Sequence, residues 1–202
     1  MYAASAILAS LYQRSNSGVA QDINVPLYDS QVAWLANQNM NFLMSNEVPK
    51  KNGNAHPNIA PYQMFTTSDG DIMVAVGSND QFLKFMKCIG CDEKKILENF
   101  KNNEQRVENI DKLDGIISKL IIKNTTSFWL NELKKNHIPC GPINNISEVF
   151  KSDYANEMGF VCYGQNSTDK RVPTVKNPVN FSKHEISYNQ ASPNHGEHKY
   201  DI

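Results

Sequence analysis

The chain has 202 residues, which is enough for one large domain or for two small ones. Hydrophobic residues make up 40% of it and charged residues 20%, so the composition excludes an intrinsically disordered protein and indicates a folded one. The net charge is -1 and no basic stripe is visible, which argues against a nucleic acid as a partner.

An amphipathic helix is predicted at the start of the chain. Ala4, Ile7, Leu8, Leu11 and Tyr12 recur at the spacing of one helical face. No Lys or Arg precedes this apolar stretch, which argues against a signal peptide, and no stretch approaches the ~20 residues of a membrane span. We therefore expect a cytoplasmic protein that does not bind or enter a membrane.

The next predicted elements are a short strand over residues 20–25 and a second amphipathic helix that begins at Pro26. The apolar face of this helix runs from Tyr28 to Leu43. Both N-terminal helices have apolar faces that no neighbouring segment obviously covers. We interpret residues 1–45 as a helical arm that packs on a surface supplied by another part of the protein.

Residues 46–61 are predicted to form a linker or a mobile loop. The segment is rich in Asn, Lys, Pro and Gly, which favour turns and irregular structure. It contains the run Gly53, Asn54, Ala55 and His56. A loop with a glycine can bring its backbone close to a ligand, so this run is a candidate functional segment.

A small α+β domain is predicted over residues 62–158. It opens with a β-hairpin whose strands cover residues 62–66 and 71–76, with an Asp-Gly pair in the turn. Ser78 and Gln81 predict a capping box at the start of the following helix. The apolar periodicity of that helix predicts an inner face of four residues, namely Phe82, Phe85, Met86 and Ile89.

Further helices are predicted at residues 107–121 and 126–133, and another follows Asn145, which forms a capping box with Glu148. A Pro-rich turn is predicted just before that last helix, at residues 138–142. Beyond it, residues 159–202 predict only two short strands, at 160–163 and 172–175, and an extended polar tail. We interpret this stretch as a return segment and tail that rests on a surface outside the small domain.

The four cysteines include one C-x-x-C pair, Cys88 and Cys91, and no second pair. A zinc site needs four ligands at closed spacing, and a redox motif is typical of a helix N-terminus after a strand. The pair instead falls near the end of an amphipathic stretch. We interpret these residues as reduced cysteines of a cytosolic protein.

Two histidines near the C-terminus, His195 and His198, are separated by three positions. A metal site there would need a third ligand, such as Glu197 or His184. The segment is flanked by Pro and Gly and is not predicted to be helical, so nothing fixes the two rings together. We therefore predict no metal site.

Several short segments, taken in order, resemble one protein family. The family is that of the class III CoA-transferases, which includes formyl-CoA transferase, carnitine CoA-transferase and related racemases. The resemblance covers nearly the whole chain. The segments that carry it are MYAASAILASL (1–11), QDINVPLYD (21–29), GNAHP (53–57) with APY (60–62), TSDG (67–70), NDQF (79–82), HIPCGP (137–142) and GEH (196–198).

The resemblance implies an α/β fold of which this chain is the C-terminal half. Residues 62–158 would be the small α+β domain of the family, and the arm and the tail would belong to its Rossmann-like large domain. Members of the family form interlocked dimers. The resemblance therefore implies a homo-oligomer, or a separate polypeptide that supplies the N-terminal half.

In this family an aspartate carboxylate attacks an acyl-CoA thioester, and aspartyl anhydride and aspartyl-CoA intermediates follow. The resemblance places that aspartate before Met1, so no catalytic residue is expected here and the chain alone is expected to be inactive. Asp22 and Asp29 match structural positions of the family. Coenzyme A, carried as acyl-CoA, is the implied substrate, without a metal. The run Gly53–His56 is implied to be the lid that keeps water away from the intermediates.

Two alternatives remain open. The first is one half of an acyl-CoA racemase of the same superfamily, although racemases tend to carry Glu-Pro-Gln-Phe where this chain has Asn-Asp-Gln-Phe at residues 79–82. The second is a non-catalytic remnant of a split gene. Only the second would leave the chain inactive even with an N-terminal half.

Overall fold

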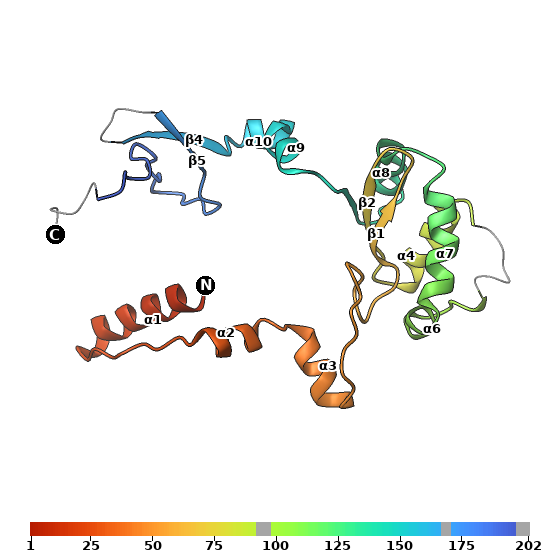
Figure 1. Ribbon diagram of the computed structural model, residues 1–202, viewed down its shortest axis with the longest axis horizontal. Helices are drawn as coiled ribbons and strands as arrows, with labels where there is room; N and C mark the ends of the chain where they lie inside the picture. Colours follow the sequence, from red (N-terminus) through yellow and green to blue (C-terminus); the bar gives the residue numbers. More distant parts are fainter. Residues whose placement is uncertain (92–97, 167–170, 197–202) are drawn as a thin grey trace. The chain divides into compact units, whose positions relative to one another are not determined.

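The computed structural model describes residues 1–91, 98–166 and 171–196 (Figure 1). The chain divides into two compact units, Met1–Gly53 and Asn54–Ile202. The division falls within the segment that the sequence predicts to be a linker. The finer division into arm, loop, small domain and tail stays a prediction.

The first unit consists of three helices joined by extended or turning segments (Figure 1). Helix α1 spans Tyr2–Ser17, α2 spans Leu27–Ala33 and α3 spans Asn37–Ser45. Helix α1 ends at Gly18, whose left-handed φ of 72° lets its N–H bond the Arg14 carbonyl at 2.9 Å. None of the three helices contains a buried residue, so their apolar faces are open to solvent.

Two predictions for this unit are wrong. Residues 20–25 are not a strand, because no segment among the described residues pairs with them and a strand needs such a partner. The helix predicted from Pro26 onward is two helices. The chain turns between them, and Ala36 takes a φ of 51°, a left-handed value that a continuous helix does not allow.

A three-stranded antiparallel sheet, with the order β1-β2-β3, lies in the second unit. Strands β1 (Tyr62–Thr66) and β2 (Asp71–Ala75) confirm the predicted hairpin, and their register places Phe65 opposite Ile72. Along β2, buried positions alternate with partly buried ones, because successive side chains point to opposite faces.

The third strand, β3 (Cys140–Pro142), occupies the segment for which the sequence predicts a Pro-rich turn. It pairs with β2 so that Val74 lies opposite Cys140, and Ala75 N–H donates to the Pro139 carbonyl at 3.0 Å. Proline lacks an N–H but keeps its carbonyl, so it is tolerated in an edge strand. The prolines led to the prediction of a turn, whereas pairing with β2 makes this segment a strand.

Four helices of the described part of the second unit pack with this sheet, and their bounds are α4 (Asn79–Cys88), α6 (Asn103–Glu108), α7 (Ile110–Ile121) and α8 (Thr126–Lys135). Helix α7 contacts β1, α8 contacts β2 and β3, and α4 and α6 pack on α8 and α7. The single helix predicted at residues 107–121 is thus two helices, which meet at Asn109.

One hydrophobic core joins the sheet to these helices, and the predicted inner face of α4 belongs to it. Trp129 forms a hydrogen bond within this core, in which its indole N–H donates to the Ile121 carbonyl at 2.6 Å. The other large residues of the core come from β1, β2, α7 and α8 and from the segments beside them, and include Phe65, Ile72, Val74, Val76, Phe100, Leu113, Ile117, Leu133 and Ile138.

The N-terminus of α4 differs in one detail from its prediction. Ser78 Oγ accepts a hydrogen bond from Gln81 N–H at 3.2 Å, which confirms the N-cap. The Gln81 side chain, however, accepts from Gly77 N–H at 2.9 Å and not from Ser78 N–H. The reciprocal bond of the predicted capping box is therefore displaced by one residue.

After β3 the chain forms α9 (Ile146–Lys151), α10 (Asp153–Glu157) and the antiparallel hairpin of β4 (Val161–Gln165) and β5 (Arg171–Val175). The predicted capping box of Asn145 and Glu148 is present at the start of α9, and the two predicted strands are confirmed. No helix among the described residues combines the length and the apolar character that crossing a membrane would need.

Candidate functional site

The candidate lid residues lie at the entrance to β1, and two of them fold back onto that strand. Asn54 Oδ1 accepts a hydrogen bond from Met64 N–H at 2.8 Å. His56 N–H donates to the Tyr62 carbonyl at 2.9 Å. The structure therefore brings Asn54 and His56 together beside one strand, and these two residues are anchored within the second unit.

The His56 ring reinforces this fold-back. It stacks on the Tyr62 ring with centroids 5.3 Å apart and planes inclined by 14°. Its Nδ1 accepts from Asn58 N–H at 3.1 Å, so this nitrogen must carry no proton. His56 thus orders the turn of its own loop, a structural role that the sequence did not indicate.

Gly53 behaves differently from the residues that follow it. Its φ of 58° is left-handed, and a Cβ at this position would have no described atom within 4 Å. The residue is exposed and stands at the boundary between the two units. Gly53 therefore has the backbone freedom that a hinge requires, whereas Ala55 is half-buried within the anchored turn.

The far end of the loop is held by helix α6. Asn103 Nδ2 donates to the Asn58 carbonyl at 2.7 Å, and its Oδ1 accepts from Ala60 N–H at 3.1 Å. Arg106 Nε donates to the Ala60 carbonyl at 2.7 Å. We call this pair of side chains, Asn103 and Arg106, the α6 clamp.

Arg106 is fully buried, and its guanidinium has several neutral partners. Its Nη1 donates to Asn79 Oδ1 at 3.0 Å and to the Phe100 carbonyl at 3.3 Å, and the group lies 4.6 Å from the centroid of the Phe82 ring. Burial lowers the pKa of Arg106 from its ordinary value. The acceptors and the ring compensate the desolvated charge and fix the side chain in one position.

The α6 clamp was not predicted from the sequence, although the sequence contains a signal for Arg106. Arg106 precedes Ile110, Leu113 and Ile117 by 4, 7 and 11 positions, the spacing of one helical face. That spacing places an arginine in line with core residues. No comparable pattern marks Asn103, because its partners lie more than 40 positions earlier in the chain.

Five acidic and thiol groups among the described residues lie in different environments. Asp22 and Asp29 are exposed in the first unit. Asp69 is bound by Thr126, and the Thr126 backbone N–H lowers the pKa of its carboxyl. Burial raises the pKa of the thiols of Cys88 and Cys140, which disfavours the thiolate. Asp69 thus has a structural role in the turn before α8, and the environments of Cys88 and Cys140 do not activate these two thiols.

The C-terminal histidines are the residues for which the sequence raises the question of a metal site. Among the described residues no group of three His, Cys, Asp or Glu side chains could hold a metal ion. Glu197 and His198 of the GEH segment lie outside the described residues, so that segment is described only as far as Gly196. His195 lies within the described part and is exposed.

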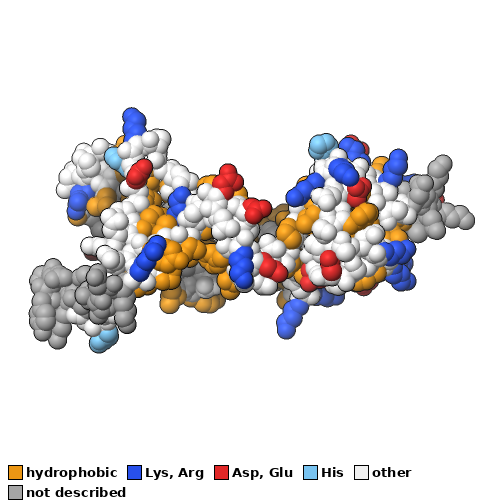
Figure 2. All heavy atoms as spheres, turned by 90° about the horizontal axis from the view of Figure 1, so that it is seen from above, with side chains coloured by type: hydrophobic (Ala, Val, Ile, Leu, Met, Phe, Trp, Pro, Cys, Tyr) orange, Lys and Arg blue, Asp and Glu red, His pale blue; other side chains and the backbone are white. Residues whose placement is uncertain are grey.

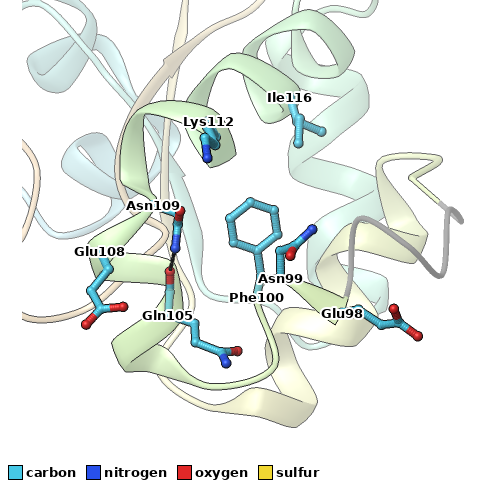
Figure 3. A pocket seen from close by; sticks show the side chains of 8 residues that line it. All are labelled: Glu98, Asn99, Phe100, Gln105, Glu108, Asn109, Lys112 and Ile116. Atoms are coloured by element: carbon cyan, nitrogen blue, oxygen red, sulfur yellow. Dashed lines mark hydrogen bonds between the residues drawn. The ribbon is translucent and has the colours of Figure 1, made fainter.

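A separate cavity of about 440 Å³ lies on the helical side of the core (Figure 3). Figure 3 shows the Phe100 ring in the midst of its lining residues, with Lys112 and Asn109 contributed by the adjoining helices. None of the candidate lid residues lines it. On the face seen in Figure 2, Lys and Arg side chains are interspersed with Asp and Glu side chains.

Comparison with known proteins shows close relatives over the full chain. Residues 1–199 match the family model of CoA-transferase family III. Succinate–glutarate CoA-transferase of Agrobacterium fabrum is 35% identical over 202 residues, which is 100% of this chain and 50% of that protein. Human succinyl-CoA:glutarate CoA-transferase is 34% identical over the same length and is covered to 46%.

A solved structure gives the same result for the fold. The crystal structure of a CAIB/BAIF family protein from Brucella suis matches with a TM-score of 0.76 and 36% identity, covering 98% of this chain and 51% of that one. The chain thus spans about half the length of the curated relatives it matches, in agreement with the expected half of a longer fold. By sequence and by fold, the chain belongs to CoA-transferase family III.

Proposed function

We propose that this chain provides the cover over the reacting thioester in a CoA-transferase, while the nucleophilic carboxylate is contributed by residues outside these 202. The observation that carries the proposal is the loop at residues 53–61, which combines an exposed glycine at one end with an anchored turn at the other. The family match and the 35% and 34% identical relatives support the reaction class.

The proposed role follows from the chemistry of the reaction. When a carboxylate attacks an acyl-CoA thioester, the CoA thiolate leaves and a mixed anhydride remains. Thiolate attack on that anhydride then releases the donor acid and leaves CoA bound as a thioester. The acceptor carboxylate attacks this thioester and displaces the CoA thiolate, which in turn attacks the acyl carbon of the second anhydride, so that acceptor-CoA leaves and the enzyme carboxylate is regenerated. Water would hydrolyse each intermediate, so transfer requires a cover that closes during the reaction and opens for exchange of substrates.

The proposed substrates are a CoA thioester and a short dicarboxylic acid. The support comes from the names of the relatives, which act on succinate and glutarate in the Agrobacterium and human proteins and on oxalate in an Acetobacter aceti protein that is 28% identical. We assign no metal to the reaction, since carboxylate chemistry on a thioester needs none.

The proposed partner is a second copy of this chain or a polypeptide that carries the remaining half of the fold. Support comes from the helices of the first unit, which expose apolar side chains. Contact of apolar surface with water is unfavourable, so a partner that covers these side chains would stabilise the protein. The exposed apolar residues of α1, α2 and α3 include Ile7, Leu8, Leu11, Tyr12, Leu27, Tyr28, Val32, Met40, Phe42 and Leu43.

The proposal is tested by complementation. The chain is expressed with the unmatched half of the Agrobacterium succinate–glutarate CoA-transferase, and the purified assembly is incubated with succinyl-CoA and glutarate. We expect chromatography to show glutaryl-CoA formed by the assembly and none formed by either polypeptide alone.

Two outcomes would contradict the proposal. Transfer by the isolated chain would show that the nucleophile lies within these residues. An assembly that forms but transfers no CoA would instead support the non-catalytic alternative. A chiral 2-methylacyl-CoA serves as a control substrate, since inversion of its α-carbon without transfer would indicate the racemase alternative.

A further inference from the structure

Ala60 is the residue at which the loop meets the small domain, and its backbone has unusual partners. It is 1% exposed. Its N–H donates to the side chain of Asn103, and its carbonyl accepts from the side chain of Arg106. Both polar groups of this buried peptide position are therefore satisfied by α6 side chains and not by the neighbouring strands.

The Asn103 carboxamide forms a donor and acceptor pair with the loop backbone, as a neighbouring strand would. Its Nδ2 donates to the Asn58 carbonyl and its Oδ1 accepts from Ala60 N–H, and these two backbone groups flank residue 59. A paired donor and acceptor fix both the distance and the register of a segment, whereas a single bond would let it slide or rotate. The loop can thus take only one position along α6.

Within the described part of the chain, the Asn103 side chain bonds the loop and not the sheet. The hairpin of β1 and β2 has its own hydrogen bonds, and the core beneath it is mostly apolar. Loss of Asn103 would therefore release one hold on residues 58–60 without opening the core. The bonds of Asn54 and His56 to β1 would remain, as would the bond of Arg106 to the loop. This separation distinguishes a residue that positions the loop from one that merely holds the fold together.

From this geometry we infer that Asn103 and Arg106 are positioning residues that set where the cover loop stands when it closes over the thioester. The inference rests on the proposed function. Neither residue needs to touch the substrate, since both act through the backbone of residues 58–60. With residues 54–60 held to β1 and α6, Gly53 is the position of the loop that keeps backbone freedom.

The test compares Asn103→Ala with Asn102→Ala. Asn102 is the adjacent residue of the same type, and its side chain caps α6 by accepting from Gln105 N–H at 2.9 Å. It is a matched control, because its substitution weakens α6 and leaves the two Asn103 bonds in place. Arg106 is left unchanged, since substitution of a fully buried arginine would disturb the core.

We expect hydrogen exchange at the Ala60 amide of the 202-residue chain to become roughly tenfold faster in Asn103→Ala, because that amide loses its acceptor. In Asn102→Ala it should stay close to the wild-type rate. In the assembled enzyme, Asn103→Ala should raise thioester hydrolysis relative to transfer severalfold, and Asn102→Ala should not. The ratio of hydrolysis to transfer reports on how well the cover excludes water. A loss of stability alone would lower both rates and leave this ratio unchanged.

The inference is overturned by unchanged exchange at Ala60, or by equal hydrolysis-to-transfer ratios in Asn103→Ala and Asn102→Ala. Failure of the wild-type assembly to transfer CoA would be a failure of the proposed function. In that case the exchange rates of the isolated chain still decide whether Asn103 positions the loop.

Discussion

Asp69 and Asp114 are two carboxyl groups of the second unit that lie in opposite environments. Asp69 Oδ1 accepts from Thr126 N–H at 2.7 Å and from two threonine hydroxyls, which favours the charged form. Asp114 accepts from the Gln63 side chain at 2.7 Å through one oxygen, and its other oxygen is buried without a partner. Burial therefore favours the neutral form of Asp114.

Asp69→Ala is expected to lower the midpoint of thermal unfolding at pH 7, because the turn loses its bonds to the first turn of α8. The pKa of Asp69 is lowered in the folded state, so its contribution is present above the ordinary value of 3.8 and is lost as the pH falls below it. The difference between wild type and variant should accordingly shrink in acid. Asp71→Ala is the control, since the Asp71 side chain accepts one hydrogen bond among the described residues, from Thr66 Oγ1 at 2.9 Å.

Asp114→Asn is expected to raise the free energy of unfolding at pH 7 by roughly 0.5 to 1 kcal/mol, because a neutral amide avoids the cost of a partly buried charge. The folded state raises the pKa of Asp114, so wild type loses stability as the pH rises from 3.8 through that pKa. The advantage of the variant should therefore vanish below pH 3.8. Urea unfolding across pH measures it, and a variant less stable than wild type at pH 7 would contradict this account.

At the scale of single elements, close backbone packing explains one glycine that the sequence left unexplained. A Cβ at Gly164 of β4 would lie 2.6 Å from Ala191 N and from Gln190 C. The tail approaches this closely because Gln165 N–H donates to the Asn189 carbonyl and Ala191 N–H donates to the Gln165 carbonyl. The tail is thus bonded to the hairpin in parallel, as an added strand would be.

Gly164→Ala is expected to displace residues 188–191 and to speed hydrogen exchange at the Ala191 amide. Gly115→Ala in α7 is the matched control. A Cβ there meets no described atom within 4 Å, and alanine favours a helix over glycine by up to about 1 kcal/mol. The same substitution should therefore destabilise the hairpin and stabilise α7. An unchanged exchange rate at Ala191 in the first variant would refute the packing argument.

The elements that the sequence predicted correctly have local causes. The β1–β2 hairpin follows from its Asp-Gly turn, and the starts of α4 and α9 follow from capping residues within three positions. Two features that the sequence did not predict have distant causes. Strand β3 exists because β2 offers it a partner, and the α6 clamp joins residues more than 40 positions apart. Periodicity reports none of these contacts.

At the scale of the whole molecule, the main feature is the exposed apolar surface of the first unit. Its helices have no buried residue, so much of their apolar area stays exposed to water. The family resemblance predicted this arm, and helical periodicity predicted its apolar faces. The sequence of this chain does not identify what would cover those faces.

Light scattering of the isolated chain at micromolar concentration is expected to give a mass of at least two chains, because association would cover the apolar faces of α1, α2 and α3. Addition of the complementary half should replace this species by a mixed assembly of defined mass. A stable monomer at that concentration would contradict the proposed partner surface.

We propose that this chain covers the reaction while another part of the enzyme carries the acyl group. Intact-mass spectrometry of the complemented assembly after brief incubation with succinyl-CoA tests this proposal. A mass increase, from a bound acyl group or bound CoA, is expected on the complementary polypeptide, together with an unchanged mass for the 202-residue chain. A covalent adduct on the 202-residue chain would contradict it.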